Sequence, residues 1–218
     1  MRIYFYKYEI IANIFVDADN QITKEKFNCE MSGTTCNIVI QLEENIICAN
    51  SGDSRSILVY DEINFENNLT KIYPLSYDCK PELPNEKKRI ESCGGSVQQD
   101  IDENNKPCGI YRVWVKGKKY PGLALSRSIG DTDAKKIGVI PNPQIIEYTL
   151  GIQSRYMMVC SDGIWEYINN EEVMKIANKY YLKNDAKGLC QDLTNISTSR
   201  WLKEDMAIDD ITVVVLFF

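Results

Sequence analysis

The 218-residue sequence contains no histidine. This absence excludes serine–histidine–aspartate and cysteine–histidine catalysis, HExxH zinc sites and every other metal site built on imidazole. The sequence also lacks the GxxxxGK[ST] and GxGxxG phosphate-binding patterns, and no cysteine is followed six residues later by an arginine. Carboxylates, thiols, lysine, tyrosine and arginine remain as the groups that could carry chemistry.

Long apolar runs are absent as well, since the longest, Val213 to Phe218, is far too short to cross a bilayer. Acidic residues outnumber basic ones by 31 to 25, which argues against nucleic acid or an anionic membrane as the main partner. The eight cysteines are scattered without a CxxC pair. This usage favours reduced thiols and a cytoplasmic location, or a nuclear one.

Alternation and turn residues along the chain predict many strands and a few amphipathic helices. The runs 36–42, 45–51 and 54–60, joined by short turns, predict a three-stranded antiparallel meander, and the polar residues 61–70 predict a loop. Further strands are expected at 111–116, 122–126, 144–150 and 156–161. Helices are expected at 4–16, 84–95 and 185–201, and a further helix is expected to begin after a cap at Asn170.

The final run, ITVVVLFF, predicts a buried, central strand because it is apolar without alternation. Meanders combined with a few helices indicate an α+β fold with packed antiparallel sheets. Neither a repeat, a low-complexity tract nor a linker divides the sequence. Residues 1–218 are therefore expected to form a single domain.

Carboxylates stand at the ends of several predicted strands. Asp162 follows the run YMMVCS, Asp209 and Asp210 directly precede the last strand, and Asp53 lies in a turn of the meander. A carboxylate next to a rigid strand offers the oxygen ligands that Mg²⁺ and Mn²⁺ prefer. Each position alone is also typical of an ordinary turn or a solvated side chain. Spacing and composition therefore leave a metal site and a structural role as alternatives.

The order of the motifs carries more information than any one of them. The segment SGTT (32–35) is followed by ANSGDSRSILVY (49–60), LSYDCKPELPNEKKRIESCGGSV (75–97), PGLALSRSIGD (121–131), VIPNPQI (139–145), VCSDGIWEYINNEEV (159–173) and IDDITVVVLFF (208–218). This ordered set, which covers residues 32–218, resembles the type 2C metal-dependent Ser/Thr protein phosphatase family.

The resemblance implies an antiparallel β-sandwich flanked by helices in αββα layers. It also implies hydrolysis of phosphoserine and phosphothreonine in phosphorylated protein substrates, by a water that Mg²⁺ or Mn²⁺ activates. By motif position, Asp162 and Asp209 match metal ligands of the family, and Asp53 matches an acidic residue associated with a third, weaker metal. Arg127 could approach a substrate phosphate, with a structural ion pair to a carboxylate as the alternative.

The sequence departs from the family pattern near its beginning. The family's phosphate-binding arginine, its Glu-Asp pair and its DGHGG motif have no counterpart, and Asp210 stands where the family usually has asparagine. The resemblance thus implies a domain without its N-terminal strands. A fragment, a variant without catalysis, and a domain whose exposed sheet edge is covered by a partner chain are the open explanations. The corresponding functions are hydrolysis and a non-catalytic interaction or regulatory module.

Overall fold

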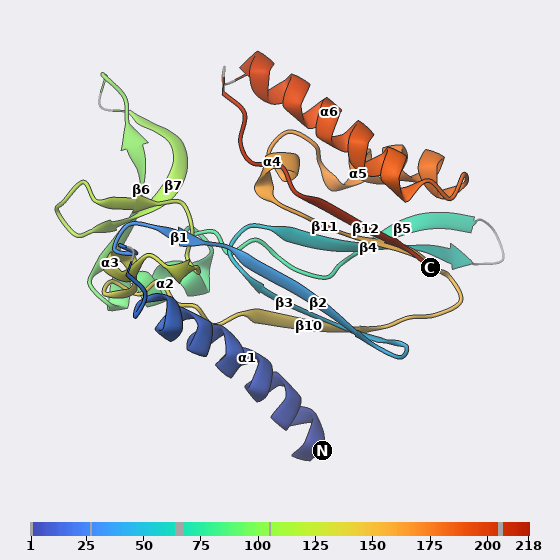
Figure 1. Cartoon of the computed structure of the whole chain (residues 1–218). Coiled ribbons are helices and arrows are strands. Elements are labelled where there is room, and N and C mark those ends of the chain that lie inside the picture. Colours follow the sequence, from blue (N-terminus) through green and yellow to red (C-terminus); the bar gives the residue numbers. More distant parts are fainter. Residues whose placement is uncertain (1, 27, 64–67, 105, 205–206) are drawn as a thin grey trace. The chain divides into compact units, whose positions relative to one another are not determined.

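The structure is a computed structural model that describes residues 2–26, 28–63, 68–104, 106–204 and 207–218 (Figure 1). Its contacts divide the chain into two compact units, which are described separately. The first unit comprises residues 1–36, 49–53 and 78–144, and the second comprises residues 37–48, 54–77 and 145–218. The single domain expected for the whole chain stays a prediction.

The first unit combines one long helix and two short ones with small antiparallel sheets. Strands β6, β7 and β8 form one sheet, and β1 pairs with β9. Ile90, Val97 and Val113 are among the side chains that form its core between helix and sheet. Its elements are α1 (Arg2–Ile22), β1 (Gly33–Thr34), α2 (Pro84–Ser92), β6 (Gly95–Ile101), β7 (Pro107–Val115), β8 (Pro121–Leu123), β9 (Ile129–Gly130) and α3 (Thr132–Lys135).

Two antiparallel sheets and three helices make up most of the second unit. The strand orders are β10-β3-β2 and β12-β11-β4-β5. The elements are β2 (Cys36–Leu42), β3 (Asn45–Ser51), β4 (Arg55–Ile63), β5 (Asn68–Pro74), β10 (Gln144–Thr149), β11 (Ser154–Cys160), α4 (Asp162–Trp165), α5 (Asn170–Tyr181), α6 (Ala186–Glu204) and β12 (Val213–Phe217). Cys36 of β2, residues 49–51 of β3 and Gln144 of β10 belong to the first unit.

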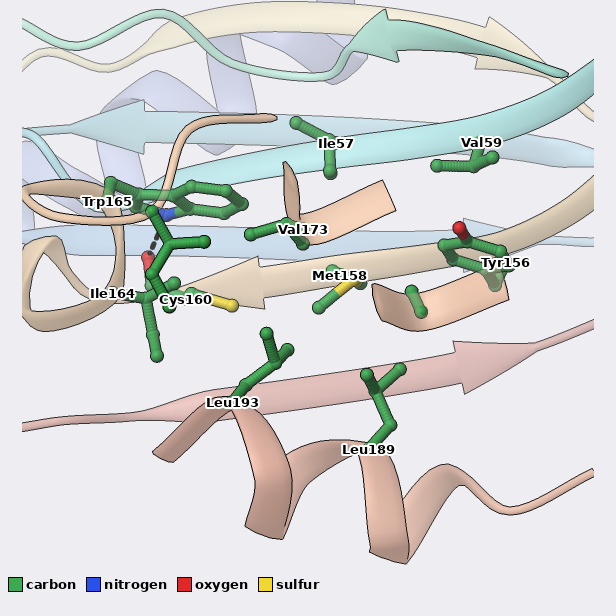
Figure 2. Packing of buried hydrophobic residues seen from close by; sticks show 12 residues of the cluster. Ile57, Val59, Tyr156, Met158, Cys160, Ile164, Trp165, Val173, Leu189 and Leu193 are labelled. Carbon is green, nitrogen blue, oxygen red and sulfur yellow. Dashed lines mark hydrogen bonds between the residues drawn. The ribbon is translucent and has the colours of Figure 1, made fainter. Parts of the chain in front are cut away.

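The side chains of β4 show how the layers of the second unit are built. Successive residues of a strand point to opposite faces of the sheet, so an apolar run fills both faces. Ile57 and Val59 pack toward helices α5 and α6 (Figure 2), and Leu58 packs with Ile46 of β3. One face of the four-stranded sheet therefore meets helices and the other meets the second sheet. The antiparallel sandwich flanked by helices is confirmed.

The predicted three-stranded meander is wrong in its third strand. Strand β3 lies in one sheet and β4 in the other, with residues 52–54 between them. Gly52 has a φ of +112°, and a Cβ there would lie 2.4 Å from the side chain of Thr35. Alternation predicts that a strand forms, but its partner depends on which sheet buries its two apolar faces.

The polar segment 61–70 is not a loop throughout. Strand β4 continues to Ile63 and β5 begins at Asn68, so these residues pair as an antiparallel ladder that includes Asp61↔Thr70. Residues 64–67 lie outside the described residues. Because β5 is an edge strand, polar side chains there remain solvated and do not oppose strand formation.

The last strand is also misplaced by the sequence prediction. Strand β12 lies at the edge of its sheet, and Val214 and Leu216 are 56% and 40% exposed. Val213, Val215 and Phe217 pack against the helix-side core. The expectation of a buried, central strand is therefore wrong, because only one of its two apolar faces is covered in the described chain.

Helix positions were predicted more closely than strand partners. Helix α5 begins at Asn170, and its cap is Asn169, whose side chain accepts a 3.0 Å hydrogen bond from the backbone N–H of Glu172. The predicted cap at Asn170 is thus one residue late. Among the described residues, every helix is too short or too polar to span a membrane.

Candidate metal-binding site

Asp162 lies where strand β11 passes into helix α4. Ser161 has an extended backbone and precedes the helix, of which Asp162 is the first residue. The indole N–H of Trp165 donates a 3.0 Å hydrogen bond back to the carbonyl of Cys160 at the end of the strand. This bond closes the short helical turn onto the strand and fixes the backbone on which Asp162 stands.

Asp209 lies in the segment that leads into strand β12. Residues 207–210 are exposed, and the side chain of Asp209 accepts a 2.7 Å hydrogen bond from the backbone N–H of Asp210. Strand β12 then begins at Val213 and pairs with β11, with Cys160 opposite Val213. The antiparallel pairing thus brings the residues before β12 next to the residues after β11.

Ser161 joins these two segments directly. Its hydroxyl donates a 3.0 Å hydrogen bond to the carbonyl of Asp210 and accepts a 3.0 Å bond from the N–H of Thr212. Its backbone N–H donates to the carbonyl of Thr212 at 3.1 Å. The structure therefore brings together the segments of the two predicted ligands Asp162 and Asp209, both in the second unit.

Gly163 permits this close approach. A Cβ at this position would lie 2.5 Å from the carbonyl oxygen of Asp210, well inside van der Waals contact. On the other side, the carbonyl of Gly163 accepts hydrogen bonds from the Ser197 hydroxyl and, at 2.8 Å, from the Trp201 indole. Helix α6 therefore supports the backbone of the Ser-Asp-Gly turn from behind.

Arg55 supports the same turn from strand β4. Its guanidinium donates a 2.8 Å hydrogen bond to the side chain of Asn170 and lies 5.1 Å from the ring centroid of Trp165. Cation–π contact and a side-chain hydrogen bond together fix α4 against the start of α5. These contacts give Arg55 a structural role.

Asp53, the third predicted ligand, belongs to the first unit. Its carboxylate accepts a 2.6 Å hydrogen bond from the ammonium group of Lys80, and its side chain is only 7% exposed. The environment of Asp53 therefore stabilises a carboxylate that is paired with a cation. The partner in the structure is a residue of the chain itself.

Arg127 forms an ion pair in the interior of the first unit. Its Nη2 and Nε lie 2.7 and 3.0 Å from the two carboxylate oxygens of Glu86, and its Nη1 donates to the carbonyl of Asn142 at 2.9 Å. Burial alone would raise the pKa of Glu86, but bonds from Arg127, Arg89 and Ser126 outweigh it and lower this pKa to about 2. The alternative of a structural ion pair describes this geometry, and contact with a substrate phosphate stays a prediction.

The side chains of Asp162 and Asp209 have the chemistry of ligands for Mg²⁺ or Mn²⁺. Asp162 and Asp209 would supply the hard oxygen donors that Mg²⁺ and Mn²⁺ prefer, and the Ser161 hydrogen bonds connect the chain segments that contain them. In the part of the chain that the structure describes, however, no three acidic or cysteine side chains gather closely enough to enclose a metal ion. Asp162 and Asp209 would therefore provide only part of the ligands that a bound Mg²⁺ or Mn²⁺ needs.

Comparison with known proteins identifies the fold. The family model for protein phosphatase 2C matches residues 7–203. The chain belongs to the protein phosphatase 2C family. Similar curated proteins include probable protein phosphatase 2C 61 of Arabidopsis thaliana, 32% identical over 205 residues that cover 92% of this chain and 60% of that protein. Probable protein phosphatase 2C 12 of Oryza sativa subsp. japonica is 32% identical over 209 residues, which cover 94% and 51%.

A solved phosphatase 2C structure has the same fold. The serine-threonine phosphatase 2C from Toxoplasma gondii superposes with a TM-score of 0.81 at 24% identity, covering 97% of this chain and 67% of that chain. The phosphatase 2C fold inferred from the ordered motifs is therefore confirmed. The present chain spans only 60% and 51% of the lengths of the two plant relatives.

Several residues that hold the predicted site residues in place within each unit were missed by sequence reasoning. Ser161 was noted only as part of the Ser-Asp-Gly motif, and Glu86 and Lys80 were not singled out. Ser161 acts on a segment 49 residues away, and Glu86 pairs with Arg127 across 41 residues. Contacts between residues so far apart produce no pattern in the local sequence. The one sequence signal for these residues was that they lie within the ordered motifs of the family.

Proposed function

We propose that this chain belongs to an enzyme that hydrolyses phosphoserine and phosphothreonine in proteins, and that Asp162 and Asp209 bind its Mg²⁺ or Mn²⁺. The observation that carries the proposal is the Ser161 hydroxyl, which bonds to both Asp210 and Thr212 and so joins the two ligand segments. Membership of the phosphatase 2C family supports the reaction class.

The residues of this chain would hold the cation and restrict its movement. Asp162 and Asp209 supply carboxylate oxygens, Ser161 positions their backbones, and Gly163 leaves room for the Asp210 carbonyl. Divalent cations in such sites lower the pKa of a water and neutralise charge on phosphoryl oxygens. Phosphorylated proteins are the proposed substrates.

A non-catalytic phosphatase-like module is the second candidate. The absence of histidine removes the DGHGG motif, and with it the carboxylate that would join two metals by family resemblance. The described residues likewise contain no closed group of three metal-ligating side chains. Such a module would keep the fold and bind a phosphoprotein or kinase without turnover.

We also propose that the edge of the four-stranded sheet pairs with a partner chain. Strand β12 lies at this edge, and an edge strand presents unpaired backbone groups to which another strand can add. Val214 and Leu216 add apolar surface to the same strand. An added strand would cover both features.

The cytoplasmic or nuclear location is a further proposal. All eight cysteines are free thiols, including the exposed Cys93 and Cys108, and free exposed thiols are usual in reducing compartments. Fluorescence microscopy of the tagged chain in its own cells tests this location.

Hydrolysis of a phosphothreonine peptide by the purified chain distinguishes the two functions. We expect phosphate release with Mn²⁺, its loss with EDTA, and its loss in Asp162→Asn. Glu91→Gln is the matched control, because this carboxylate is 49% exposed and belongs to the first unit, far along the chain from both Asp162 and Asp209. If a chain shown to be folded by circular dichroism releases no phosphate under any of these conditions, the non-catalytic module is the function of these residues.

A further inference from the structure

Asp53 is a buried carboxylate with a cationic partner, Lys80. Its side chain is 7% exposed, and the Lys80 ammonium lies 2.6 Å from its Oδ2. Removing a carboxylate from water is costly unless an opposite charge and hydrogen bonds compensate for it. Lys80 supplies both, so the negative charge of Asp53 is already neutralised without an external ion.

Lys80 is held in place by the residue before it. The N–H of Cys79 donates a 2.9 Å hydrogen bond to the carbonyl of Gly52, and the carbonyl of Cys79 accepts one of 2.9 Å from Ser126. Cys79 itself is fully buried. The backbone next to Lys80 is therefore fixed against the turn that carries Asp53, and the ammonium differs in this respect from a solvated surface lysine.

The turn on the other side is equally restricted. The side chain of Asn50 donates a 3.1 Å hydrogen bond to the carbonyl of Gly52, the same oxygen that Cys79 contacts. Gly52 has positive φ and packs so closely on Thr35 that a Cβ would not fit. Asp53 therefore projects from a restricted turn toward a lysine whose neighbouring backbone is anchored to the same turn.

We propose that the Lys80 ammonium is the resident cation of the Asp53 site, and that it occupies the position of the third, weaker metal. Mg²⁺ and Mn²⁺ bind carboxylate oxygen closely, and an ammonium group on the same oxygen repels them. A divalent ion must therefore displace Lys80 before it can bind Asp53. The residues around Asp53 do not fit a metal while Lys80 is present, and Asp53 instead anchors the segment that contains Cys79.

Substitution of Lys80 should convert this position into a divalent-cation site. In Lys80→Met the carboxylate of Asp53 stays buried without its counter-charge, which lowers stability. A divalent ion then supplies the missing charge and stabilises the folded state in proportion to its occupancy. Lys80→Arg keeps a cation and should keep the wild-type behaviour.

The experiment measures melting temperature against Mn²⁺ concentration in an Asp162→Asn, Asp209→Asn background, which removes the site proposed above. We expect no response in this background, a rise in melting temperature when Lys80→Met is added, and loss of that rise when Asp53→Asn is added as well. Lys80→Arg in the same background should show no response. Because the background lacks both proposed ligands, the result is independent of whether the chain hydrolyses phosphopeptides.

Two outcomes would overturn the proposal. One is a rise in the melting temperature of the background with Mn²⁺, in the presence of Lys80, that is lost when Asp53→Asn is added. Asp53 would then bind the metal beside the lysine. The other is a folded Lys80→Met variant that does not respond to Mn²⁺. Should Lys80→Met not fold, Mn²⁺ binding measured by electron paramagnetic resonance on the background, with and without Asp53→Asn, still decides: equal binding supports the proposal, and loss on Asp53→Asn overturns it.

Discussion

The hydroxyl of Ser161 donates a 3.0 Å hydrogen bond to the backbone carbonyl of Asp210, 49 residues further along the chain. The same oxygen accepts a bond from the N–H of Thr212, so one side chain satisfies groups on both sides of Ile211. These contacts connect the end of β11 with the beginning of β12. The spacing of the two proposed metal ligands therefore depends on a residue that is not itself a proposed ligand.

Replacement of Ser161 by alanine should loosen this connection. Loss of the hydrogen bonds is expected to cost about 1 kcal/mol of unfolding free energy. Because the side chain orients proposed ligands, we expect Mn²⁺ affinity to fall about tenfold. Urea unfolding and a Mn²⁺ titration of the same preparation measure the two effects.

Ser199→Ala is the control for this substitution. The Ser199 hydroxyl is exposed and bonds only within helix α6, to the carbonyl of Asn195 at 2.8 Å. It should leave Mn²⁺ affinity unchanged. Equal Mn²⁺ affinities for Ser161→Ala and the wild type would show that the connection is structural and does not position ligands.

Gly163→Ala tests the close contact between the Ser-Asp-Gly turn and Asp210. The added methyl would lie 2.5 Å from the Asp210 carbonyl, so one of the two segments must move. We expect a loss of about 1–3 kcal/mol in unfolding free energy, as for other overpacked sites. Chemical denaturation measures this loss.

Gly151→Ala provides a matched comparison. The nearest contact for its Cβ is the side-chain oxygen of Gln153 at 3.3 Å, the end of a flexible side chain. We expect its stability to stay within about 0.5 kcal/mol of the wild type. If both alanine variants are equally stable, the turn tolerates the methyl and the contact does not restrict it.

The sequence predicted the location of the candidate site better than its surroundings. Asp162 and Asp209 were found because motifs keep their order along the chain, and the pairing of β11 with β12 brings their segments together. Lys80 lies 27 residues from Asp53, and no hydrophobic periodicity connects an ion pair at that separation. Its role could be recognised only from the folded chain.

Strand partners were the least predictable part of the fold. The runs that form β3 and β4 are both apolar and joined by a short turn, which is also what a hairpin requires. The chain instead changes sheets at residues 52–54, because Leu58 of β4 packs against Ile46 of β3 across the sandwich. Local sequence describes each strand, whereas the choice of sheet depends on contacts between distant faces.

Glu86 should make the first unit sensitive to acid. Hydrogen bonds lower its folded-state pKa to about 2. The ordinary pKa of glutamate, which applies to the unfolded chain, is about 4.3. Its contribution to stability is therefore complete above the unfolded pKa and is lost as the pH falls toward 2. Glu86→Gln should lose about 3 kcal/mol near neutral pH, because Arg127 and Arg89 stay buried without their partner.

Urea unfolding of the wild type and Glu86→Gln at several pH values measures this contribution. The difference in unfolding free energy between the two proteins should be largest near pH 7. It should shrink as the pH falls from about 5 to about 2, which is roughly the interval between the unfolded and folded pKa values of Glu86. Glu91→Gln is the control, since its 3.9 Å pair with Lys87 is largely exposed and should contribute little. A difference that does not vary with pH would mean that packing, not ionisation, explains the effect.

The edge strand β12 offers two neighbouring valines with opposite environments. Val214 is 56% exposed, whereas Val215 packs against the helix-side core. A lysine on an exposed edge discourages pairing with other chains, so Val214→Lys should reduce self-association and change stability by less than about 0.5 kcal/mol. Val215→Lys should clearly destabilise the second unit, because it places a charge against the apolar helix-side core, where Val215 is partly buried. Analytical ultracentrifugation and thermal melting compare the two, and equal destabilisation by both would show that the outer face of β12 is covered in solution.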